Sequence, residues 1–390
     1  MRLLLAILLL SGAQLGTSIY LPALPAIAAD LAIDRALAQQ LITLYFLGFG
    51  LSQLLFGSLS DALGRWRVFL WGQGLFVLGT LACLVLADSA WGLGFGRLLQ
   101  GLGAGAPHVL ARAILSDGYR GRRLQGALAN LAVAAGVLPI FAPLLGGLIS
   151  EWQGWRPLFA YSAAYLALVL VIGARLLPRD GATGPWSPAH MARTYGQLIQ
   201  SRTFLTLGLY RWLPYMLMVT SFTFYPFALQ QDLGLAADDY GRAMMIPAAG
   251  LIAGSLLAKL ALRRFSTLAS IGLFAPLIAL GGLLLTTVPM TVPLALAACC
   301  CLTLALGGLF PACLQLMLAP FRHQAGSAVA LSGAVEMFLF TTTAQLANRY
   351  LIEDLADLGG LYLAVAAIYL GHWVLDLARQ RRISALAVGH

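Results

Sequence analysis

The chain has 390 residues, of which 60% are hydrophobic and only 10% charged, with a mean hydropathy of +0.84 and a formal net charge of +9. Soluble domains carry about 25% charged residues, so this composition excludes an ordinary soluble protein and indicates that lipid surrounds most of the chain. The positive charge does not indicate a nucleic-acid-binding protein, because no basic tract with interleaved aromatic residues is present.

Long apolar segments follow one another along the whole chain. A membrane-spanning helix needs about 20 apolar residues, and cutting the chain at charged and turn-forming clusters gives about twelve such segments. They are predicted at residues 3–29, 37–60, 66–87, 91–115, 124–150, 155–177, 204–231, 240–262, 265–288, 291–318, 325–349 and 358–378. Continuous runs of this length indicate helices, since the strands of a transmembrane barrel alternate over about ten residues. The predicted fold class is therefore an all-α integral membrane protein.

The first segment begins with Arg2 and a short leucine-rich stretch, which is also typical of a signal peptide. Because the apolar stretch continues to Ala29, we predict a retained first helix. The five cysteines lie within apolar segments and lack the spacing of metal ligands. Neither a metal site nor a disulfide framework is expected.

The longest polar connection lies near the middle of the chain and divides it into two sets of six predicted helices. We predict an N-terminal half at 1–177, a cytoplasmic linker at 178–203, a C-terminal half at 204–378 and a cytoplasmic tail at 379–390. Most of the 24 Lys and Arg residues fall on the side of the membrane that holds both termini. By the positive-inside rule, both termini are predicted in the cytoplasm, and the chain is predicted to span its membrane many times.

The loop between the second and third predicted helices contains Gly57, Asp61, Gly64 and Arg65. Gly57 would let two helices approach, Gly64 would end a helix in a left-handed conformation, and Asp61 would cap a helix or pair with an arginine. A related sequence at 254–265 occupies the same loop of the second half, which suggests a duplicated transporter with its substrate site between the halves. We interpret the loop as a gating latch, although the same residues would also suit a simple cytoplasmic turn.

Two further predicted helices of the N-terminal half carry unusual residues. Arg97 and Gln100 lie one turn apart, and a charge at this depth costs on the order of 3 kcal/mol unless it is paired or hydrated. The next helix contains Pro139 and Pro143, followed by the glycine pair Gly146 and Gly147. These residues would kink the helix and let backbones pack closely.

The seventh predicted helix has the densest group of aromatic and Met residues in the chain. Such a surface accepts varied apolar ligands, although contact with lipid or with the membrane interface would explain part of the group equally well. Arg211 lies in this helix, and if it faces a cavity it would pair with Glu336 or receive anionic substrates. Glu336 is the carboxylate that lies well inside a predicted span, where it is a natural proton carrier.

The sequence resembles the major facilitator superfamily, in particular the Bcr/CflA branch of drug:proton antiporters and its EmrD-type multidrug exporters. The resemblance rests on the loop with Gly57, Asp61, Gly64 and Arg65, on RLLQGLGAG at 97–105, on APLLGG at 142–147, and on further similarity in IYLPALPAIAADL at 19–31, WRPLF at 155–159, YPF at 225–227 and AGSAVAL at 325–331. It implies two six-helix halves that alternate access to a central site, a coupling role for Arg97, and a role of the APLLGG helix in exchange without leakage.

The resemblance also exposes one departure from the branch. Its members often carry an acid just before the YLP sequence of the first helix, where this chain has Ser18. We therefore predict that the titrating acid has moved from the first helix to Glu336 in the eleventh. The alternative is a neutral Glu336 that serves only as a hydrogen-bonded structural group.

Together these features predict a secondary transporter, not an enzyme, that exports hydrophobic drugs or toxic compounds in exchange for protons. The alternative is a proton-coupled transporter of one metabolite, such as a sugar or an amino acid. The expected proton-coupling residues are Glu336 and Arg97, and the substrate cavity is expected to be lined by Tyr20, Tyr45, Gln100, Arg211, Tyr215, Met218, Phe222, Tyr225 and Met337. No cofactor is expected besides the proton gradient as energy source. The expected partners are hydrophobic small molecules, protons and the lipid bilayer, without nucleic acid, and the chain is expected to be a monomer.

Overall fold

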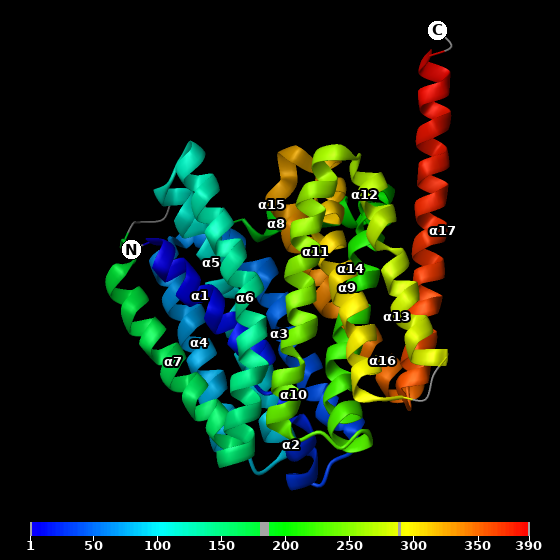
Figure 1. Cartoon of the computed structure of the whole chain (residues 1–390). Coiled ribbons are helices and arrows are strands. Elements are labelled where there is room, and N and C mark those ends of the chain that lie inside the picture. Colours follow the sequence, from blue (N-terminus) through cyan, green and yellow to red (C-terminus); the bar gives the residue numbers. More distant parts are fainter. Residues whose placement is uncertain (1, 180–186, 288–289, 389–390) are drawn as a thin grey trace.

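The computed structural model describes residues 2–179, 187–287 and 290–388, except for the side chains of some helical residues, among them Asp61 and Pro139. All regular elements within these ranges are helices. They form a bundle of long helices that run side by side, with the N-terminal half on one side of the view and the C-terminal half on the other (Figure 1). We call the end of the bundle near Arg2 and Val388 the terminal end and the opposite end the distal end.

The N-terminal half is built from seven α-helices and one short 3-10 turn. They are α1 (Arg2–Ser18), η1 (Leu21–Ala23), α2 (Leu24–Asp30), α3 (Arg35–Leu63), α4 (Arg65–Val85), α5 (Ala90–Gly118), α6 (Gly121–Gln153) and α7 (Arg156–Leu176). Asp34 caps α3 by accepting a hydrogen bond from the Leu37 backbone N–H at 2.7 Å. Gly64 separates α3 from α4 with a φ of 90°, which favours glycine.

The linker and the C-terminal half contain shorter elements, because several passes are interrupted. They are α8 (Pro188–Gln200), α9 (Arg202–Phe227), the π-helical turn η2 (Ala228–Asp232), α10 (Ala237–Ala243), α11 (Met245–Arg264), α12 (Thr267–Phe274), α13 (Pro276–Thr287), α14 (Val292–Leu318), η3 (Ala319–Gln324), α15 (Ala325–Val335), the π-helical turn η4 (Glu336–Phe340), α16 (Thr341–Tyr350) and α17 (Leu355–Val388).

The predicted all-helical membrane fold is confirmed. Nine passes in the described ranges are long and apolar enough to cross a membrane. The remaining long helices, α5, α6 and α9, have 29, 33 and 26 residues and pack against these passes within the bundle. Taken together they account for the about twelve spans that the sequence predicts.

Proline positions explain where the predicted spans are broken. The first span changes direction before Pro22, and α12 gives way to α13 at Ala275, directly before Pro276. A proline lacks the backbone N–H that continues the helical ladder, so the chain turns or restarts at these points. The predicted tail at 379–390 is not a separate segment as far as the backbone is described, since α17 continues to Val388.

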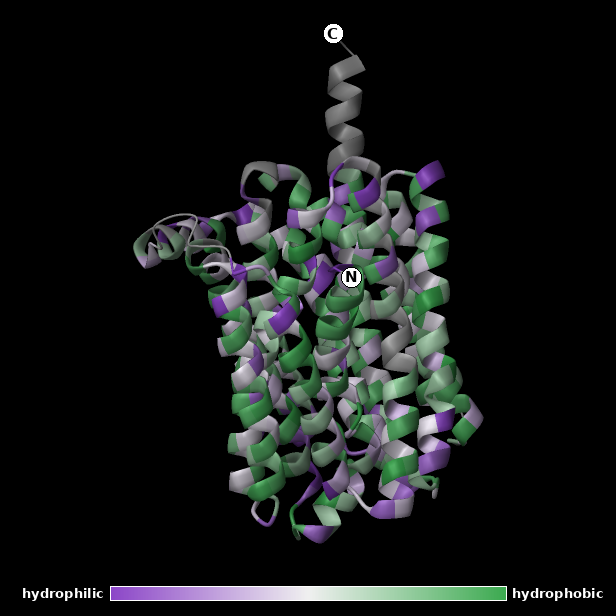
Figure 2. Cartoon of the chain, turned by 90° about the vertical axis from the view of Figure 1, so that its left-hand side faces the viewer, coloured by the Kyte–Doolittle hydropathy of each residue, from purple (hydrophilic) through white to green (hydrophobic). Residues whose placement is uncertain are grey.

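The outer surface of the bundle is apolar over its middle, and polar residues gather towards its two ends (Figure 2). Trp71, Leu78, Leu256, Leu339 and Ile368 are each more than half exposed. Side chains of this kind would be costly in water and are satisfied by lipid tails. The distribution agrees with a bundle that stands across a bilayer.

Helix α8 lies within the predicted linker and packs against the terminal end of α3. Ser58 donates a hydrogen bond to the Met191 sulfur at 3.1 Å, and the Tyr195 hydroxyl donates to the Leu54 carbonyl at 3.2 Å. Burial raises the pKa of Tyr195 above its ordinary value of 10.0, so the hydroxyl keeps its proton at neutral pH. These two bonds tie the linker helix to α3, and it also packs against α9 and α15 of the C-terminal half.

Candidate functional site

An arginine and a glutamate meet inside the C-terminal half. Arg211 on α9 forms an ion pair with Glu336, in which its Nε donates to Oε1 and its Nη2 donates to Oε2 at 3.2 Å. Glu336 is 2% exposed. The two-point geometry is the strong form of an arginine–carboxylate contact. The sequence offered this pairing as one of two roles for Arg211, and the structure brings the two side chains together.

The backbone around Glu336 is also unusual. Glu336 begins η4, the π-helical turn between α15 and α16, and the Thr341 hydroxyl donates to the Glu336 carbonyl at 3.3 Å. Such turns insert an extra residue into a helix and occur often at functional sites. Met337, the next residue, accepts a hydrogen bond on its sulfur from the Tyr215 hydroxyl at 3.0 Å. Three of the predicted cavity residues, Arg211, Tyr215 and Met337, therefore surround Glu336.

A second charged centre lies inside the N-terminal half. Arg97 on α5 is 1% exposed, and its guanidinium carbon lies 3.9 Å from the Tyr20 ring centre and 4.5 Å from the Tyr45 ring centre. Cation–π contacts of this kind contribute about 2 kcal/mol when water is excluded. The aromatic cage therefore provides part of the stabilisation that a buried charge needs.

Arg97 has polar partners as well, but no carboxylate among the residues that the structure describes. Its Nη1 donates to the Gly16 carbonyl at 3.0 Å and to the side-chain oxygen of Gln100. Gln100 in turn donates to Thr80 at 2.9 Å. Arg97 Nε and Nη2 and the Tyr20 hydroxyl have no hydrogen-bond partner in the described part of the chain. Arg97 is therefore balanced by aromatic rings and neutral oxygens within the described residues.

The two centres belong to different halves, and no contact within the described ranges joins Arg97 to Glu336. They are linked through an apolar cluster to which Tyr45, Phe49, Tyr215 and Met337 all belong. The halves approach closely there, since a Cβ added at Gly50 of α3 would lie 2.5 Å from the Met337 Cβ. Packing at the middle of the bundle is therefore shared between the halves.

The remaining predicted cavity residues lie on α9. Met218 and Phe222 are half-buried and pack against the same apolar cluster. Tyr225 is fully buried and donates to the Ala295 carbonyl of α14 at 3.0 Å, so its ring points into the C-terminal half. Met218 and Phe222 are thus better placed than Tyr225 to meet a substrate between the halves.

The loop motif holds the terminal ends of α3, α4 and α5 together. Arg65 donates to Asp117 at the end of α5 at 3.0 Å and also to Ser60. The prediction that Gly57 allows a close helix approach is wrong, because a Cβ at this position would meet no atom within 4 Å. The side chain of Asp61 lies outside the described residues. Among the residues whose side chains are described, the pair of Arg65 and Asp117 ties α4 to α5.

The glycines of the APLLGG helix do permit close packing. A Cβ added at Gly146 of α6 would lie 1.7 Å from the Ile19 carbonyl oxygen, and one at Gly147 would lie 2.3 Å from the Ala237 carbonyl oxygen. Pro143 is buried, and its carbonyl faces Gly241 of α10. The side chain of Pro139 is outside the described residues. Helix α6 thus brings the first pass and the C-terminal half into backbone contact.

We predict that G146A lowers stability by about 1 to 3 kcal/mol, because the Ile19 backbone has no room to give way. The matched change G57A should leave stability unchanged or raise it slightly, since alanine is the better helix former and the site is open. Thermal unfolding of both purified variants in detergent measures the difference. Equal melting temperatures for the two variants would contradict the close packing described at Gly146.

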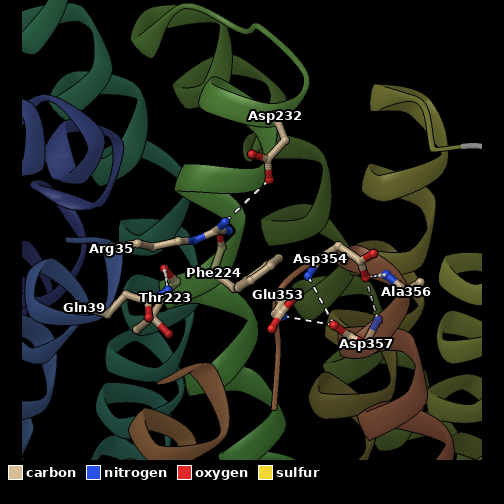
Figure 3. A network of polar contacts seen from close by, with 9 residues as sticks. All are labelled: Arg35, Gln39, Thr223, Phe224, Asp232, Glu353, Asp354, Ala356 and Asp357. Carbon is tan, nitrogen blue, oxygen red and sulfur yellow. Dashed lines mark hydrogen bonds and ion pairs between the residues drawn. The ribbon is translucent and has the colours of Figure 1, made fainter. Parts of the chain in front are cut away.

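The distal end of the bundle is closed by contacts between the halves (Figure 3). Arg35 at the start of α3 lies 3.9 Å from the Phe224 ring centre, donates to the Phe224 carbonyl at 3.2 Å and pairs with Asp232 at 3.5 Å. One turn later, Gln39 donates to the Thr223 carbonyl at 3.1 Å. We call these five residues the distal clasp.

Further contacts extend the closure along α3. Gln345 of α16 donates to the Ala36 carbonyl at 2.8 Å and accepts from Thr43 at 3.1 Å. Gln230 donates to the Pro22 carbonyl at 2.9 Å. Among the described residues, every hydrogen bond and ion pair that joins the two halves lies in this region. The two halves are therefore joined by hydrogen bonds and an ion pair at the distal end.

We predict that R35Q opens the distal end more often than in the unchanged protein, because it removes the ion pair and the cation–π contact. A cysteine at Thr43, placed in a background without the five native cysteines, reports opening through its reaction with a membrane-impermeant maleimide. Labelling should rise about tenfold, which corresponds to the loss of one charged hydrogen bond. The control is R156Q, whose arginine pairs with Asp30 and Asp88 inside one half. An equal rise in both variants would contradict the clasp.

Sequence reasoning missed the distal clasp and the neighbours of Glu336. Nothing in the sequence distinguishes Arg35 from other charges at the ends of spans, and no spacing indicates the hydrogen bond between Trp212 and Ser332. The proximity of Arg35 to Asp232 depends on how the two halves dock. A basic residue directly before a long span was the one available signal.

Comparisons with known proteins agree with this architecture. The sequence profile described as Major Facilitator Superfamily matches residues 6–341. Multidrug resistance protein D of Escherichia coli is 35% identical over 176 residues, which cover 45% of this chain and 44% of that protein. Multidrug resistance protein MdtL of Klebsiella pneumoniae is 30% identical over 233 residues, which cover 60% of this chain and 59% of that protein. MdtL of Escherichia coli is 30% identical over 261 residues, which cover 67% of this chain and 64% of that protein. The matched regions thus span about half to just under two thirds of these relatives.

Solved structures show the same fold at low sequence identity. The nucleoside transporter NupG gives a TM-score of 0.73 at 12% identity, with 97% of this chain and 99% of that chain covered. A peptide transporter POT in complex with sulfate gives 0.77 at 14% identity, with 99% and 95% covered. At such identities the likeness concerns the fold alone, and the cargo of those transporters is not carried over.

Proposed function

This chain belongs to the major facilitator superfamily, and we propose that it exports hydrophobic drugs or other toxic compounds in exchange for protons. It is a multi-pass membrane transporter and not an enzyme. Relatives at 30% to 35% identity bear the names of multidrug resistance proteins, which supports small molecules as the cargo.

The observation that carries the proposal is the buried pair of Glu336 and Arg211. A carboxylate inside a membrane span is costly unless it is paired or protonated, and its presence there usually marks a functional site. Adding a proton to Glu336 removes its charge and leaves Arg211 without a counter-charge. The two protonation states therefore favour different local arrangements, which is what a coupling site needs.

We assign the exchanged proton to Glu336. In the proposed cycle, drug binds while Glu336 is unprotonated, and protonation from the far side of the membrane favours drug release. The apolar and aromatic side chains of α9, among them Tyr215, Met218 and Phe222, suit hydrophobic compounds of varied shape. Arg97 with its tyrosine cage is proposed as the second polar centre that responds to this cycle.

The orientation follows from the charge distribution. With both termini in the cytoplasm of a bacterial cell and the chain in its inner membrane, the distal end faces the periplasm. The distal clasp is then a periplasmic gate, and the conformation in hand is closed to the periplasm. Rocking of the two halves about the middle of the bundle would open that side. We propose that a single chain suffices for the cycle and that it needs no cofactor besides the proton gradient.

The test is dye efflux from cells that produce the protein, compared with cells that do not. Cells with the protein should expel lipophilic dyes and tolerate several unrelated drugs, and an uncoupler should abolish the efflux. Efflux that survives the uncoupler would overturn proton exchange. Proton-dependent transport of one metabolite, with no effect on any drug, would favour the alternative of a specific metabolite transporter.

A further inference from the structure

A short chain of buried hydrogen bonds ends on the Glu336 carboxylate. The Trp212 Nε1 donates to the Ser332 hydroxyl at 3.0 Å, and the Ser332 hydroxyl donates to Glu336 Oε1 at 3.3 Å. The three residues are 3%, 1% and 2% exposed. Trp212 lies on α9 next to Arg211, whereas Ser332 lies on α15 one turn before Glu336. The carboxylate is thus held from two directions, by an arginine and by a serine.

The direction of these bonds follows from the donors available. An indole N–H can only donate, so the serine oxygen must accept from Trp212, and the single serine proton remains for another acceptor. Buried serine and threonine residues in helices usually give that proton to the carbonyl four residues earlier. Thr220 and Ser221 on α9 do so, to Met216 and Leu217. Ser332 instead gives its proton to Glu336.

The other groups that face Glu336 do not duplicate the hydrogen bond that Ser332 donates to its carboxylate. From α9, Arg211 neutralises the carboxylate, and the Tyr215 hydroxyl is directed to the Met337 sulfur. From α16, Thr341 donates to the Glu336 backbone rather than to its side chain. Within the described residues, Ser332 is therefore the neutral donor to the carboxylate.

The charged and titratable groups around Arg211 complete the surroundings. From α14, Phe310 lies under its guanidinium at 5.3 Å, and Cys313 is close enough to interact with its charge. From α5, Arg112 of the other half is near enough to repel it. From α3, the close neighbours of α15 and η4 are the uncharged Gln53 and Gly50. No second carboxylate faces Glu336 in the described part of the chain.

We propose that Trp212 and Ser332 are positioning residues that stabilise the unprotonated form of Glu336 and thereby set the pH at which drug binding gives way to proton binding. The inference rests on the proposed function, in which Glu336 carries the exchanged proton. A hydrogen bond donated to a carboxylate favours its charged form. Trp212 adds to this by holding the serine hydroxyl in the orientation that donates to Glu336.

The consequence has a definite sign. If the serine hydroxyl is removed, the charged carboxylate loses a donor, and protonation becomes easier. Drug binding to S332A should therefore be lost at a higher pH than in the unchanged protein, by about one pH unit. W212F keeps a ring but not the N–H, so its shift should have the same direction and a smaller size. S332T retains a hydroxyl and should bind drug with the original pH dependence.

The experiment measures binding of a fluorescent lipophilic cation dye to the purified full-length protein in detergent, as a function of pH. Two control variants remove equivalent groups elsewhere in the same half. S221A removes a buried hydroxyl that bonds Leu217 and Tyr362, and W373F removes an indole N–H that bonds Leu268. Both controls should leave the midpoint of the pH profile where it is.

A double-variant cycle separates positioning from general weakening of the helix packing. If Trp212 acts through Ser332, adding W212F to S332A should produce no further shift in the midpoint, whereas independent structural effects would add. The inference would be overturned if the midpoint shifts of W212F and S332A added in the double variant, or if S332A had the same pH profile as the unchanged protein. Either result would leave the proposal of proton-coupled export intact. If dye binding to the unchanged protein did not depend on pH, the proposed function would be overturned, and this inference with it.

Discussion

Replacement of Glu336 by glutamine should abolish drug export driven by a pH gradient while leaving the protein folded, with drug binding that is weaker and no longer depends on pH. The amide has nearly the same shape as the carboxylic acid and mimics its neutral form, so the space beside Arg211 stays filled. It has no acidic proton to exchange, so the cycle loses its link to the gradient. Because Glu336 is the carboxylate buried in the span, 2% exposed, no nearby acid can replace it within the described residues.

The measurement uses vesicles that contain the purified protein and a drug whose accumulation is followed after a pH jump. E336Q should fall to the level of empty vesicles, whereas exchange of labelled for unlabelled drug without a gradient should continue. E151Q is the matched control, since Glu151 is exposed near the distal end of α6. Gradient-driven export by E336Q at the original rate would show that another group carries the proton.

Replacement of Arg211 by glutamine should have the largest effect on stability. It leaves the Glu336 carboxylate buried beside a neutral side chain, and breaking one partner of a buried ion pair costs roughly 3 to 5 kcal/mol. Part of this cost is relieved if Glu336 takes up a proton, in which case the variant should resemble a permanently protonated transporter. Either way, R211Q should melt at a lower temperature and should fail to export drug.

The double variant with R211Q and E336Q provides the decisive comparison. Removing both charges leaves two neutral, hydrogen-bonding side chains, so most of the stability lost in R211Q should return while export remains absent. R349Q serves as the control, because Arg349 is exposed at the distal end of α16 and should change stability by no more than about 0.5 kcal/mol. A double variant as unstable as R211Q would contradict the assigned ion pair.

Hydropathy and the scarcity of charge explain why so much of the fold could be predicted. A lipid-exposed backbone must satisfy its hydrogen bonds within each helix, so apolar length alone places the spans to within a few residues. Arg97, Arg211 and Glu336 stood out because charges inside spans are costly and rarely occur without a reason. The same reasoning offered a pair with Glu336 as one of two roles for Arg211, the other being to receive anionic substrates.

Contacts that depend on the docking of helices could not be predicted in the same way. The bond between Trp212 and Ser332 joins residues 120 positions apart, and nothing in their spacing indicates that their helices touch. The prediction at Gly57 failed in the opposite way. A glycine in the loop motif suggested close packing of two helices, but the structure leaves open space beside this residue. Motifs locate important segments, but packing decides what each residue touches.

The presence of Ser18 in place of an acid can be interpreted from the contacts of Arg97 and Glu336. Arg97 has aromatic rings and neutral oxygens around it but no described carboxylate, whereas Glu336 has an arginine of its own. An acid at position 18, which the family resemblance would imply, is replaced here by Ser18. In this chain the acid–base pair is instead built entirely within the C-terminal half.

The central claim, that Glu336 carries the exchanged proton, is tested most directly by the protons released when drug binds. The purified protein is placed in weakly buffered detergent solution with a pH-sensitive dye, below the pH at which drug binding is complete, and drug is added. The unchanged protein should release protons as drug binds, whereas E336Q, at a drug concentration high enough to saturate its weaker binding, should release none. Equal proton release from both proteins would contradict the account.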